Sequence, residues 1–170
     1  MCIIIYKPAN VSMPDRFMRY RCELSNPHGF GYATPTKYYR TMNCREFEDH
    51  LNSITKAEPA IMHCRIATHG SLKKSNCHPF NDPVTGISFA HNGILDIPTI
   101  GDKTDSETAF LTRFVPVLRK YGLDSKKLDM AVAEIIGASR FAFLSPEGEV
   151  RLFGRWYEGT DGCFYSHIPW

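Results

Sequence analysis

The chain has 170 residues, of which 43% are hydrophobic and 22% charged, and its formal net charge is +2. This length and composition predict one globular domain, residues 1–170, and exclude a disordered or fibrous chain. The small net charge does not favour a nucleic acid as partner, and no apolar run approaches the roughly 20 residues that cross a bilayer.

Taken in chain order, short runs of β-branched and aromatic residues predict eight strands, and apolar residues at helical spacing predict helices between them. The expected strands are Cys2–Tyr6, Gly31–Ala33, Lys37–Thr41, Ala60–Ile66, Ile87–Ala90, Arg140–Ser145, Val150–Gly154 and Gly162–Ser166. The expected helices are Asp15–Leu24, Arg45–Ile54, Asp105–Tyr121 (bent at Pro116) and Ser125–Ile136. Strands at both ends of the chain with helices between them are typical of an α+β fold with antiparallel sheets.

Cysteine usage favours a reducing compartment. The chain has six cysteines, and its first apolar run, Cys2–Tyr6, is too short for a secretory signal. Free thiols without such a signal are typical of cytoplasmic proteins. No C-x-x-C pair exists, and the adjacent pairs His63-Cys64 and Cys77-His78 do not match zinc-ligand spacing, so no metal site is expected.

Cys2 follows the initiator methionine at the start of the first expected strand. Removal of Met1 would leave a thiol and a free α-amine on one carbon, with ordinary pKa values of roughly 8.5 and 7.7–8.0. One group can then act as base for the other, which gives a nucleophile that needs no histidine. If Met1 stays, the nitrogen is an amide and cannot act as a base. Cys2 is then an ordinary packing residue.

Four short motifs follow Cys2 along the chain: HCRIATHG at 63–70, NCHPF at 76–80, HNG at 91–93 and TDSE at 104–107. In this order and near this spacing, they resemble the motifs of class II glutamine amidotransferases, whose N-terminal-nucleophile (Ntn) domain begins with a cysteine after loss of methionine. The resemblance implies a four-layer αββα sandwich with two mostly antiparallel sheets, in a small stand-alone domain. It also implies a reaction that needs no cofactor.

The resemblance implies catalytic roles for three residues. Cys2 would attack the side-chain amide of glutamine, and its amine would carry the thiol proton to the departing ammonia. Asn92, through its side-chain amide, and Gly93, through its backbone N–H, would hold the oxyanion. Water would then hydrolyse the thioester and release glutamate. Taken alone, an Asn-Gly pair between apolar residues is more typical of a hairpin turn.

The resemblance implies substrate-binding roles for four more residues. Arg65 would bind the α-carboxylate with its planar guanidinium, and Asp105 would bind the α-ammonium. Thr68 and His69 would line the same pocket, largely through backbone atoms. Simpler interpretations stay open: Arg65 as a salt-bridged surface residue, and Asp105 as a charge that favours a helix N-terminus.

Other positions bear on the reaction less directly. His63, His78 and His91 are expected to be hydrogen-bonded structural residues, because the proposed chemistry already has its base. His28 stands where many members of the family have an acidic residue, and Ile66 stands where some have tryptophan. These two departures leave the catalytic set intact and bear on substrate preference.

Three functions follow as alternatives. The first is a stand-alone amidase that acts on glutamine, with ammonia passing to a separate synthase subunit. The second is a hydrolase of a larger γ-glutamyl amide, and the third is an inactive binding or regulatory module. The intact set of candidate site residues favours an enzyme with a small-molecule substrate, and neither a nucleic acid nor a membrane is expected as partner.

Overall fold

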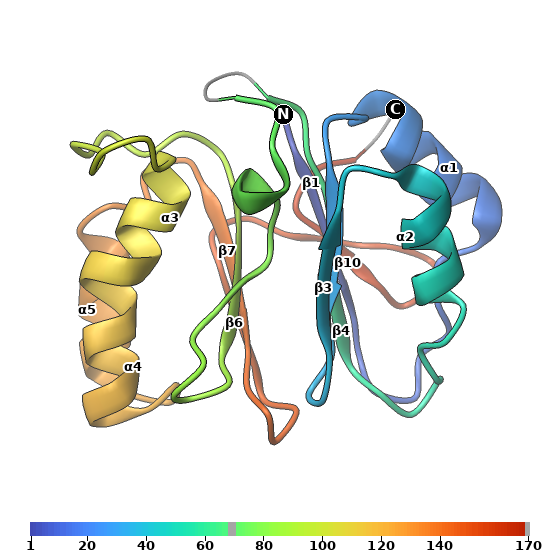
Figure 1. Cartoon of the computed structure of the whole chain (residues 1–170). Helices are drawn as coiled ribbons and strands as arrows, with labels where there is room; N and C mark the ends of the chain where they lie inside the picture. Colours follow the sequence, from blue (N-terminus) through green and yellow to red (C-terminus); the bar gives the residue numbers. More distant parts are fainter. Residues whose placement is uncertain (68–70, 169–170) are drawn as a thin grey trace.

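Two β-sheets packed face to face form the centre of the molecule, and helices cover the outer face of each sheet (Figure 1). The computed structural model describes residues 1–67 and 71–168. The layers therefore follow the order helices, sheet, sheet, helices. This arrangement confirms the expected four-layer α+β sandwich.

The first sheet contains the strand that follows Cys2. Its strands are β1 (Ile3–Lys7), β2 (Phe30–Ala33), β3 (Tyr38–Thr41), β4 (Ala60–Cys64), β9 (Tyr157–Glu158) and β10 (Phe164–Tyr165). Within the described residues they lie in the order β3-β2-β4-β1-β10-β9, and each neighbouring pair is antiparallel. β1 is therefore an interior strand between β4 and β10, and Cys2 directly precedes it.

The second sheet contains the HNG motif. Its strands are β5 (Phe80–Asn81), β6 (Ser88–Asn92), β7 (Arg140–Leu144) and β8 (Val150–Phe153), and in the described chain they are antiparallel neighbours in that order. β1 packs against β6 across the interface between the sheets. Hydrogen bonds that meet at one serine, described below, hold the start of β1 and the end of β6 at the same end of the sandwich.

Capping residues fix where the helices begin. α1 (Arg16–Ser25) and α2 (Cys44–Leu51) cover the first sheet, and their N-caps Asp15 and Asn43 accept hydrogen bonds from backbone N–H groups of the first turn. α3 (Asp105–Ala109), α4 (Val115–Tyr121) and α5 (Lys126–Ala133) cover the second sheet. Thr104 caps α3 by accepting a hydrogen bond from the backbone N–H of Glu107 at 3.2 Å.

A π-helical turn, Phe110–Phe114, joins α3 to α4. The helix predicted over Asp105–Tyr121 is thus present in three consecutive segments. Pro116 lies just after the π turn. A proline lacks the N–H that an α-helical turn needs, and its ring collides with the carbonyl four residues before it, so the wider turn relieves this conflict.

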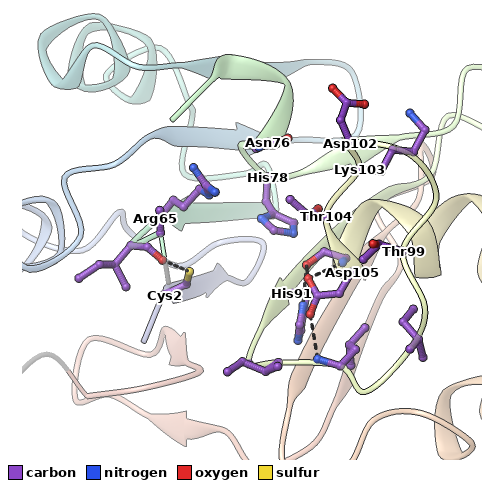
Figure 2. A pocket seen from close by; sticks show the side chains of 17 residues that line it. Cys2, Arg65, Asn76, His78, His91, Thr99, Asp102, Lys103, Thr104 and Asp105 are labelled. Atoms are coloured by element: carbon purple, nitrogen blue, oxygen red, sulfur yellow. Dashed lines mark hydrogen bonds between the residues drawn. The ribbon is translucent and has the colours of Figure 1, made fainter. Parts of the chain in front are cut away.

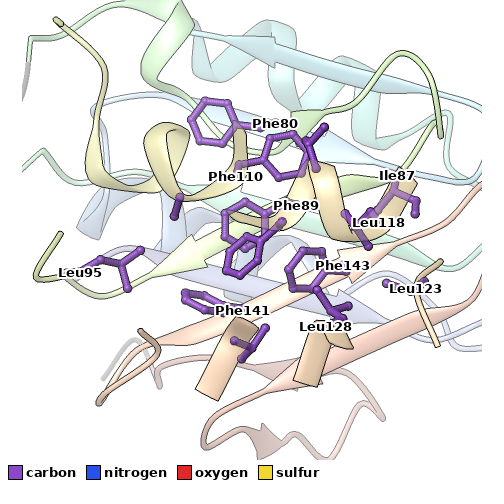
Figure 3. Close-up of a cluster of buried hydrophobic side chains, with 14 residues drawn as sticks. Phe80, Ile87, Phe89, Leu95, Phe110, Leu118, Leu123, Leu128, Phe141 and Phe143 are labelled. Atoms are coloured by element: carbon purple, nitrogen blue, oxygen red, sulfur yellow. The ribbon is translucent and has the colours of Figure 1, made fainter. Parts of the chain in front are cut away.

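The core has three parts that match the layers. One, rich in phenylalanine, fills the space between the second sheet and its helices, as Figure 3 shows. Another lies between the first sheet and α1 and α2. The third lies between the sheets and consists of mostly small or aliphatic side chains: Ile4, Ala33, Ile61, Ala90, Ala142 and Leu144. The small residues allow the sheets to approach closely, and that approach sets the relative position of β1 and β6.

Each expected strand and helix is present, with ends that differ from the prediction by up to three residues. Strands β5 and β9 were not predicted, because two residues are too few to show alternation. The strand expected over Ala60–Ile66 ends at Cys64, and Arg65 and Ile66 belong to the loop that follows. This difference matters, because it turns Arg65 into a residue of the cavity described next.

Candidate active site

A cavity of about 360 Å³ opens at the end of the sandwich where β1 begins. Of the residues predicted from sequence, Cys2, Arg65, Gly93 and Asp105 line it. Figure 2 shows Cys2 and Arg65 on one side of the cavity and Asp105 on the other. Residues more than 100 positions apart in sequence therefore face the same space. Thr68 and His69, which were also predicted, lie outside the described residues.

Cys2 has a thiol that is partly buried and neutral near pH 7. Its Sγ donates a hydrogen bond to the carbonyl oxygen of Ile66, with 3.5 Å between sulfur and oxygen. Burial raises the pKa of the Cys2 thiol, although the positive charges of the amino terminus and Arg65 act in the opposite direction. Met1 is 61% exposed, so it is accessible to an aminopeptidase. A buried, protonated thiol needs a nearby base before it can attack a substrate.

Asn92 is the last residue of β6, and its side chain is buried. Its Nδ2 donates to Ser166 Oγ at 3.0 Å, and its Oδ1 has no hydrogen-bond partner among the described residues. β6 continues into the loop 93–104 and then α3, so the interpretation of Asn92-Gly93 as a two-residue hairpin turn is wrong. Asn92 directly precedes Gly93 in the chain and does not itself line the cavity.

Gly93 occupies a position that other residues cannot take without strain. Its φ of 144° lies in a region that favours glycine. A Cβ added there would lie 2.2 Å from Ser139 Oγ. Ser139 in turn donates a hydrogen bond to the carbonyl oxygen of Ile94 at 3.3 Å. The backbone at Gly93 is therefore held close to β7, and Gly93 lines the cavity.

Arg65 is only 4% exposed, so the interpretation of this residue as a surface arginine is wrong. Its backbone N–H donates to the carbonyl oxygen of Gly29 at 2.8 Å, which fixes the loop after β4. Its Nη1 donates to the carbonyl oxygen of Ser71 at 3.4 Å. The guanidinium is thus a buried positive charge on the wall of the cavity, where a ligand carboxylate can meet it.

Asp105, the first residue of α3, makes two kinds of contact. Its Oδ2 accepts a hydrogen bond from the backbone N–H of Leu95 at 2.8 Å, and its Oδ1 accepts from the backbone N–H of Ser106 at 2.7 Å. The first contact ties the loop after Gly93 to the helix. Asp105 also has the charge that favours a helix N-terminus, so the simpler interpretation of this residue holds alongside its place in the cavity.

His28 holds the loop that bears Arg65. Its ring Nδ1 accepts a hydrogen bond from the backbone N–H of Ala67 at 3.0 Å. The backbone N–H of His28 donates to the carbonyl oxygen of Arg65 at 2.9 Å. An acidic residue at this position could accept the same hydrogen bond from Ala67. The departure at His28 therefore preserves the contact while it removes a negative charge near the cavity.

Comparison with known proteins identifies the family. The sequence model described as "Glutamine amidotransferases class-II" matches residues 50–150, which is more than half of the chain. The chain belongs to the class II glutamine amidotransferases. Hydrolysis of the glutamine side-chain amide is the general reaction of this family, and its members are enzymes.

Curated relatives of this amidotransferase come from Saccharomyces cerevisiae. A putative glutamine–fructose-6-phosphate aminotransferase (isomerizing) is 43% identical over 54 residues, which cover 28% of this chain and 21% of the relative. The probable glutamine amidotransferase DUG3 is 34% identical over 92 residues, which cover 44% of this chain and 25% of the relative. The chain thus spans about a fifth to a quarter of the length of these relatives.

Solved structures share the fold of this amidotransferase. The glutamine phosphoribosylpyrophosphate amidotransferase of B. subtilis, in complex with ADP and GMP, has a TM-score of 0.60 at 14% identity and covers 97% of this chain and 41% of its own. A structure described as the allosteric regulatory enzyme of purine biosynthesis gives 0.59 at 16% identity, with the same coverage. The similarity supports an Ntn-type fold over nearly the whole length of the chain.

Three buried histidines, His63, His78 and His91, lie in or next to the wall of the cavity. The rings of His63 and His78 are 4.4 Å apart, and those of His78 and His91 are 6.4 Å apart. Burial lowers the pKa of His63 to about 3 and that of His91 to about 4, and it lowers the pKa of His78 well below its usual value. All three are therefore neutral near pH 7. In the part of the chain that the structure describes, no three His, Cys, Asp or Glu side chains are placed to hold a metal ion.

The expected structural role fits two of these histidines. His63 Nε2 contacts the carbonyl oxygen of His91 at 3.2 Å, and His91 Nδ1 contacts Ser106 Oγ at 2.7 Å. His78 differs, since neither of its ring nitrogens has a partner among the described residues. His78 and His91 also line the cavity, which sequence reasoning missed.

Among the residues described, no helix is long and apolar enough to cross a bilayer.

Proposed function

We propose that this chain is an amidohydrolase that uses Cys2 to cleave the side-chain amide of glutamine into glutamate and ammonia. Its active form is the single domain that remains after Met1 is removed, and it works in the cytoplasm, where free cysteines stay reduced. One observation carries the proposal. Cys2, at the start of an interior strand, faces the same cavity of about 360 Å³ as Arg65 and Asp105.

The α-amine of Cys2 is the base in this mechanism. Because burial keeps the thiol protonated near neutral pH, a base must remove its proton before the sulfur attacks. The histidines beside the cavity have pKa values too low to hold this proton. A free α-amine, with a pKa of roughly 7.7–8.0, can accept it and pass it to the nitrogen of the leaving group, which departs as ammonia.

The oxyanion forms when the sulfur adds to the amide carbon. Gly93, which lines the cavity, offers its backbone N–H, and Asn92, the residue before it, offers its side-chain amide. Asn92 ends β6 and Gly93 follows it, and β6 packs against β1 across the interface of the sheets. Two donors fixed by the fold stabilise developing charge without reorganisation, and each donor contributes about 10²–10³ in turnover.

The substrate is held through its α-amino acid end. Arg65 supplies a buried guanidinium that matches a carboxylate, and Asp105 supplies a carboxylate that matches an ammonium. The two charges face each other across the cavity, so they fix the orientation of the amide toward Cys2. After ammonia leaves, a water molecule attacks the thioester, and the sulfur recovers its proton as glutamate is released.

A larger γ-glutamyl amide is the second candidate substrate. The cavity continues from Gly93 along Ile94, Leu95 and Ile97, an apolar wall that free glutamine does not need. A substituent on the amide nitrogen would contact this wall. In that case an amine rather than ammonia leaves. Where ammonia is the product, a separate synthase subunit is the partner that would consume it.

The decisive experiment measures ammonia release from glutamine and amine release from a panel of γ-glutamyl amides. Intact mass first establishes that Met1 is absent. Wild-type protein should turn over at least one of these compounds, and a glutamine-mimicking alkylator should label Cys2. If trimmed, folded protein is inert toward the whole panel, an inactive binding or regulatory module is the only one of the three alternative functions that remains.

Two variants sharpen this experiment. Cys2→Ala should abolish hydrolysis, whereas Cys44→Ser should keep it. Cys44 is a matched control because it is also a free, partly buried cysteine, and it lies at the start of α2 away from the cavity. Equal loss of hydrolysis in both variants would contradict the assignment of Cys2 as the nucleophile.

A further inference from the structure

We propose that Ser166 is a positioning residue that holds the side-chain amide of Asn92 in register with Cys2. This inference rests on the proposed function, because it concerns the oxyanion site of that reaction. It assigns a role to a residue at the end of the chain that no motif singles out. The argument uses the contacts of one buried hydroxyl group.

Ser166 follows β10 and is completely buried. Its Oγ accepts a hydrogen bond from the backbone N–H of Ile4 at 2.8 Å and another from Asn92 Nδ2 at 3.0 Å. Its own backbone N–H donates to the carbonyl oxygen of Ile4 at 2.9 Å. Ile4 is two residues from Cys2 along β1, so the same serine contacts the strand of the nucleophile and the candidate oxyanion donor.

These contacts cross the interface between the two sheets. Ile4 belongs to the first sheet and Asn92 to the second, and Ser166 Oγ contacts both. Within the described residues, the Asn92 side chain has one hydrogen-bond partner: its Nδ2 donates to Ser166 Oγ. Its Oδ1 has no partner there. Without the hydroxyl, the amide would have nothing in this part of the chain to fix its rotation.

A hydroxyl suits this position because it can accept and donate. Ile4 N–H occupies one lone pair of Ser166 Oγ, and the other lone pair can accept from Asn92 Nδ2. The O–H proton can instead donate to Asn92 Oδ1, which then leaves both Nδ2 hydrogens for the oxyanion. In either case at least one Nδ2 hydrogen is left for the reaction. Alanine can hold neither end of the amide.

The first test separates oxyanion stabilisation from the reactivity of the sulfur. Hydrolysis passes through an oxyanion, whereas alkylation of Cys2 by iodoacetamide displaces iodide and forms none. Ser166→Ala should lower kcat by about 10- to 100-fold, the range expected for a misplaced catalytic group, with KM within about twofold of wild type. The rate of Cys2 alkylation, followed by mass spectrometry of the N-terminal peptide, should stay at the wild-type value.

Ser145→Ala is the matched control. Ser145 is also a buried serine, 3% exposed, and its Oγ accepts from the backbone N–H groups of Glu147 and Glu149. Ser145 follows Leu144, the last residue of β7. Asn92 pairs with Arg140, the first residue of β7, so Ser145 lies at the end of the strand that is far from the site. This variant should keep both hydrolysis and alkylation at wild-type rates.

A double-mutant cycle, with kcat referred to the concentration of folded protein in each variant, provides the second test. If Ser166 acts through Asn92, Ser166→Ala should cause no further loss of kcat in protein that already has Asn92→Ala. Additive losses would overturn the proposal, as would an unchanged kcat or a parallel fall of hydrolysis and alkylation in Ser166→Ala. These results leave the proposed function intact, whereas inert wild-type protein would overturn both.

Discussion

Asp105 Oδ2 accepts a hydrogen bond from the backbone N–H of Leu95, with 2.8 Å between oxygen and nitrogen. The carboxylate that we assign to the substrate ammonium therefore also fixes the loop that follows Gly93. A substitution at Asp105 can act through either role, so the two roles must be separated by the choice of variant.

Asp105→Asn keeps an oxygen for Leu95 but removes the negative charge. We expect the fold to be retained and KM for glutamine to rise by about 10- to 100-fold, as for loss of a hydrogen bond to a charged group. Glu107→Gln removes the same charge from the same helical turn, where Glu107 pairs with Lys103, and should leave KM unchanged. Steady-state kinetics decide the point, and an equal rise of KM in both variants would contradict the assignment.

Arg65→Lys tests whether the planar guanidinium binds the substrate carboxylate. Lysine keeps the positive charge but not the fork of donors, so KM for glutamine should rise by at least about tenfold. 4-Aminobutanamide, which lacks the α-carboxylate, serves as the control substrate. Its kcat/KM should be nearly the same for both proteins. A similar penalty on both substrates would mean that Arg65 supports the loop rather than the substrate.

The pH dependence of the reaction should report the α-amine. This group acts as a base only when unprotonated, so kcat/KM should rise with pH through an apparent pKa near roughly 8. Burial lowers the pKa of His63 to about 3 and that of His91 to about 4, so these histidines should add no inflection between pH 6 and 7. Protein that retains Met1 should be inactive across the whole range. Equal activity with and without Met1 would refute the role of the amine.

Gly93→Ala should disrupt the end of β6. The new Cβ meets Ser139 Oγ at 2.2 Å, and the φ of 144° is unfavourable for alanine. We expect a loss of about 1–3 kcal/mol in the free energy of unfolding, together with loss of hydrolysis. Gly101→Ala also has a positive φ, of 60°, but nothing lies within 4 Å of its new Cβ. Urea denaturation should show a smaller loss there, with hydrolysis retained.

Glu23 predicts a pH-dependent stability away from the cavity. Burial, helped by the neighbouring Glu48 carboxyl, raises the pKa of Glu23 to about 7, and Cys44 Sγ donates to its Oε2 at 2.9 Å. Between its usual pKa of 4.5 and about 7, the folded chain binds this proton more tightly than the unfolded chain does. The stabilisation is therefore present at low pH and is lost as the pH rises through 7.

Glu23→Gln should remove that loss, because glutamine is neutral at every pH. The variant should be more stable than wild type at pH 8 by on the order of 1 kcal/mol and about equal to it at pH 5. Glu46→Gln is the opposite control, since hydrogen bonds from Thr41 and Tyr39 lower the pKa of Glu46. It should lower stability at pH 8. Urea denaturation at the two pH values measures both variants, and identical curves for wild type and Glu23→Gln would contradict the burial of a protonated carboxyl.

Sequence patterns were enough to predict the helices, every strand except the two-residue β5 and β9, and the family, because alternation, apolar spacing and motif order are local or ordered signals. They could not reveal Ser166. Its contact with Ile4 joins residues 162 positions apart, and its contact with Asn92 joins residues 74 positions apart. Nor could they show that Arg65 leaves its strand, because β4 ends where its pairing with β2 ends, at Cys64 opposite Phe30, 34 residues earlier in the chain.

The layer between the sheets has a consequence for the chemistry. Cys2 precedes a strand of one sheet, and the proposed oxyanion donors Asn92 and Gly93 lie at the end of a strand of the other, so the thickness of the alanine-rich layer sets how far apart they stand. A branched side chain at Ala90 would push the sheets apart. We expect turnover to fall in such a variant although every group that touches the substrate is unchanged. The distance from the nucleophile to the oxyanion donors would then depend on alanines that take no part in the chemistry.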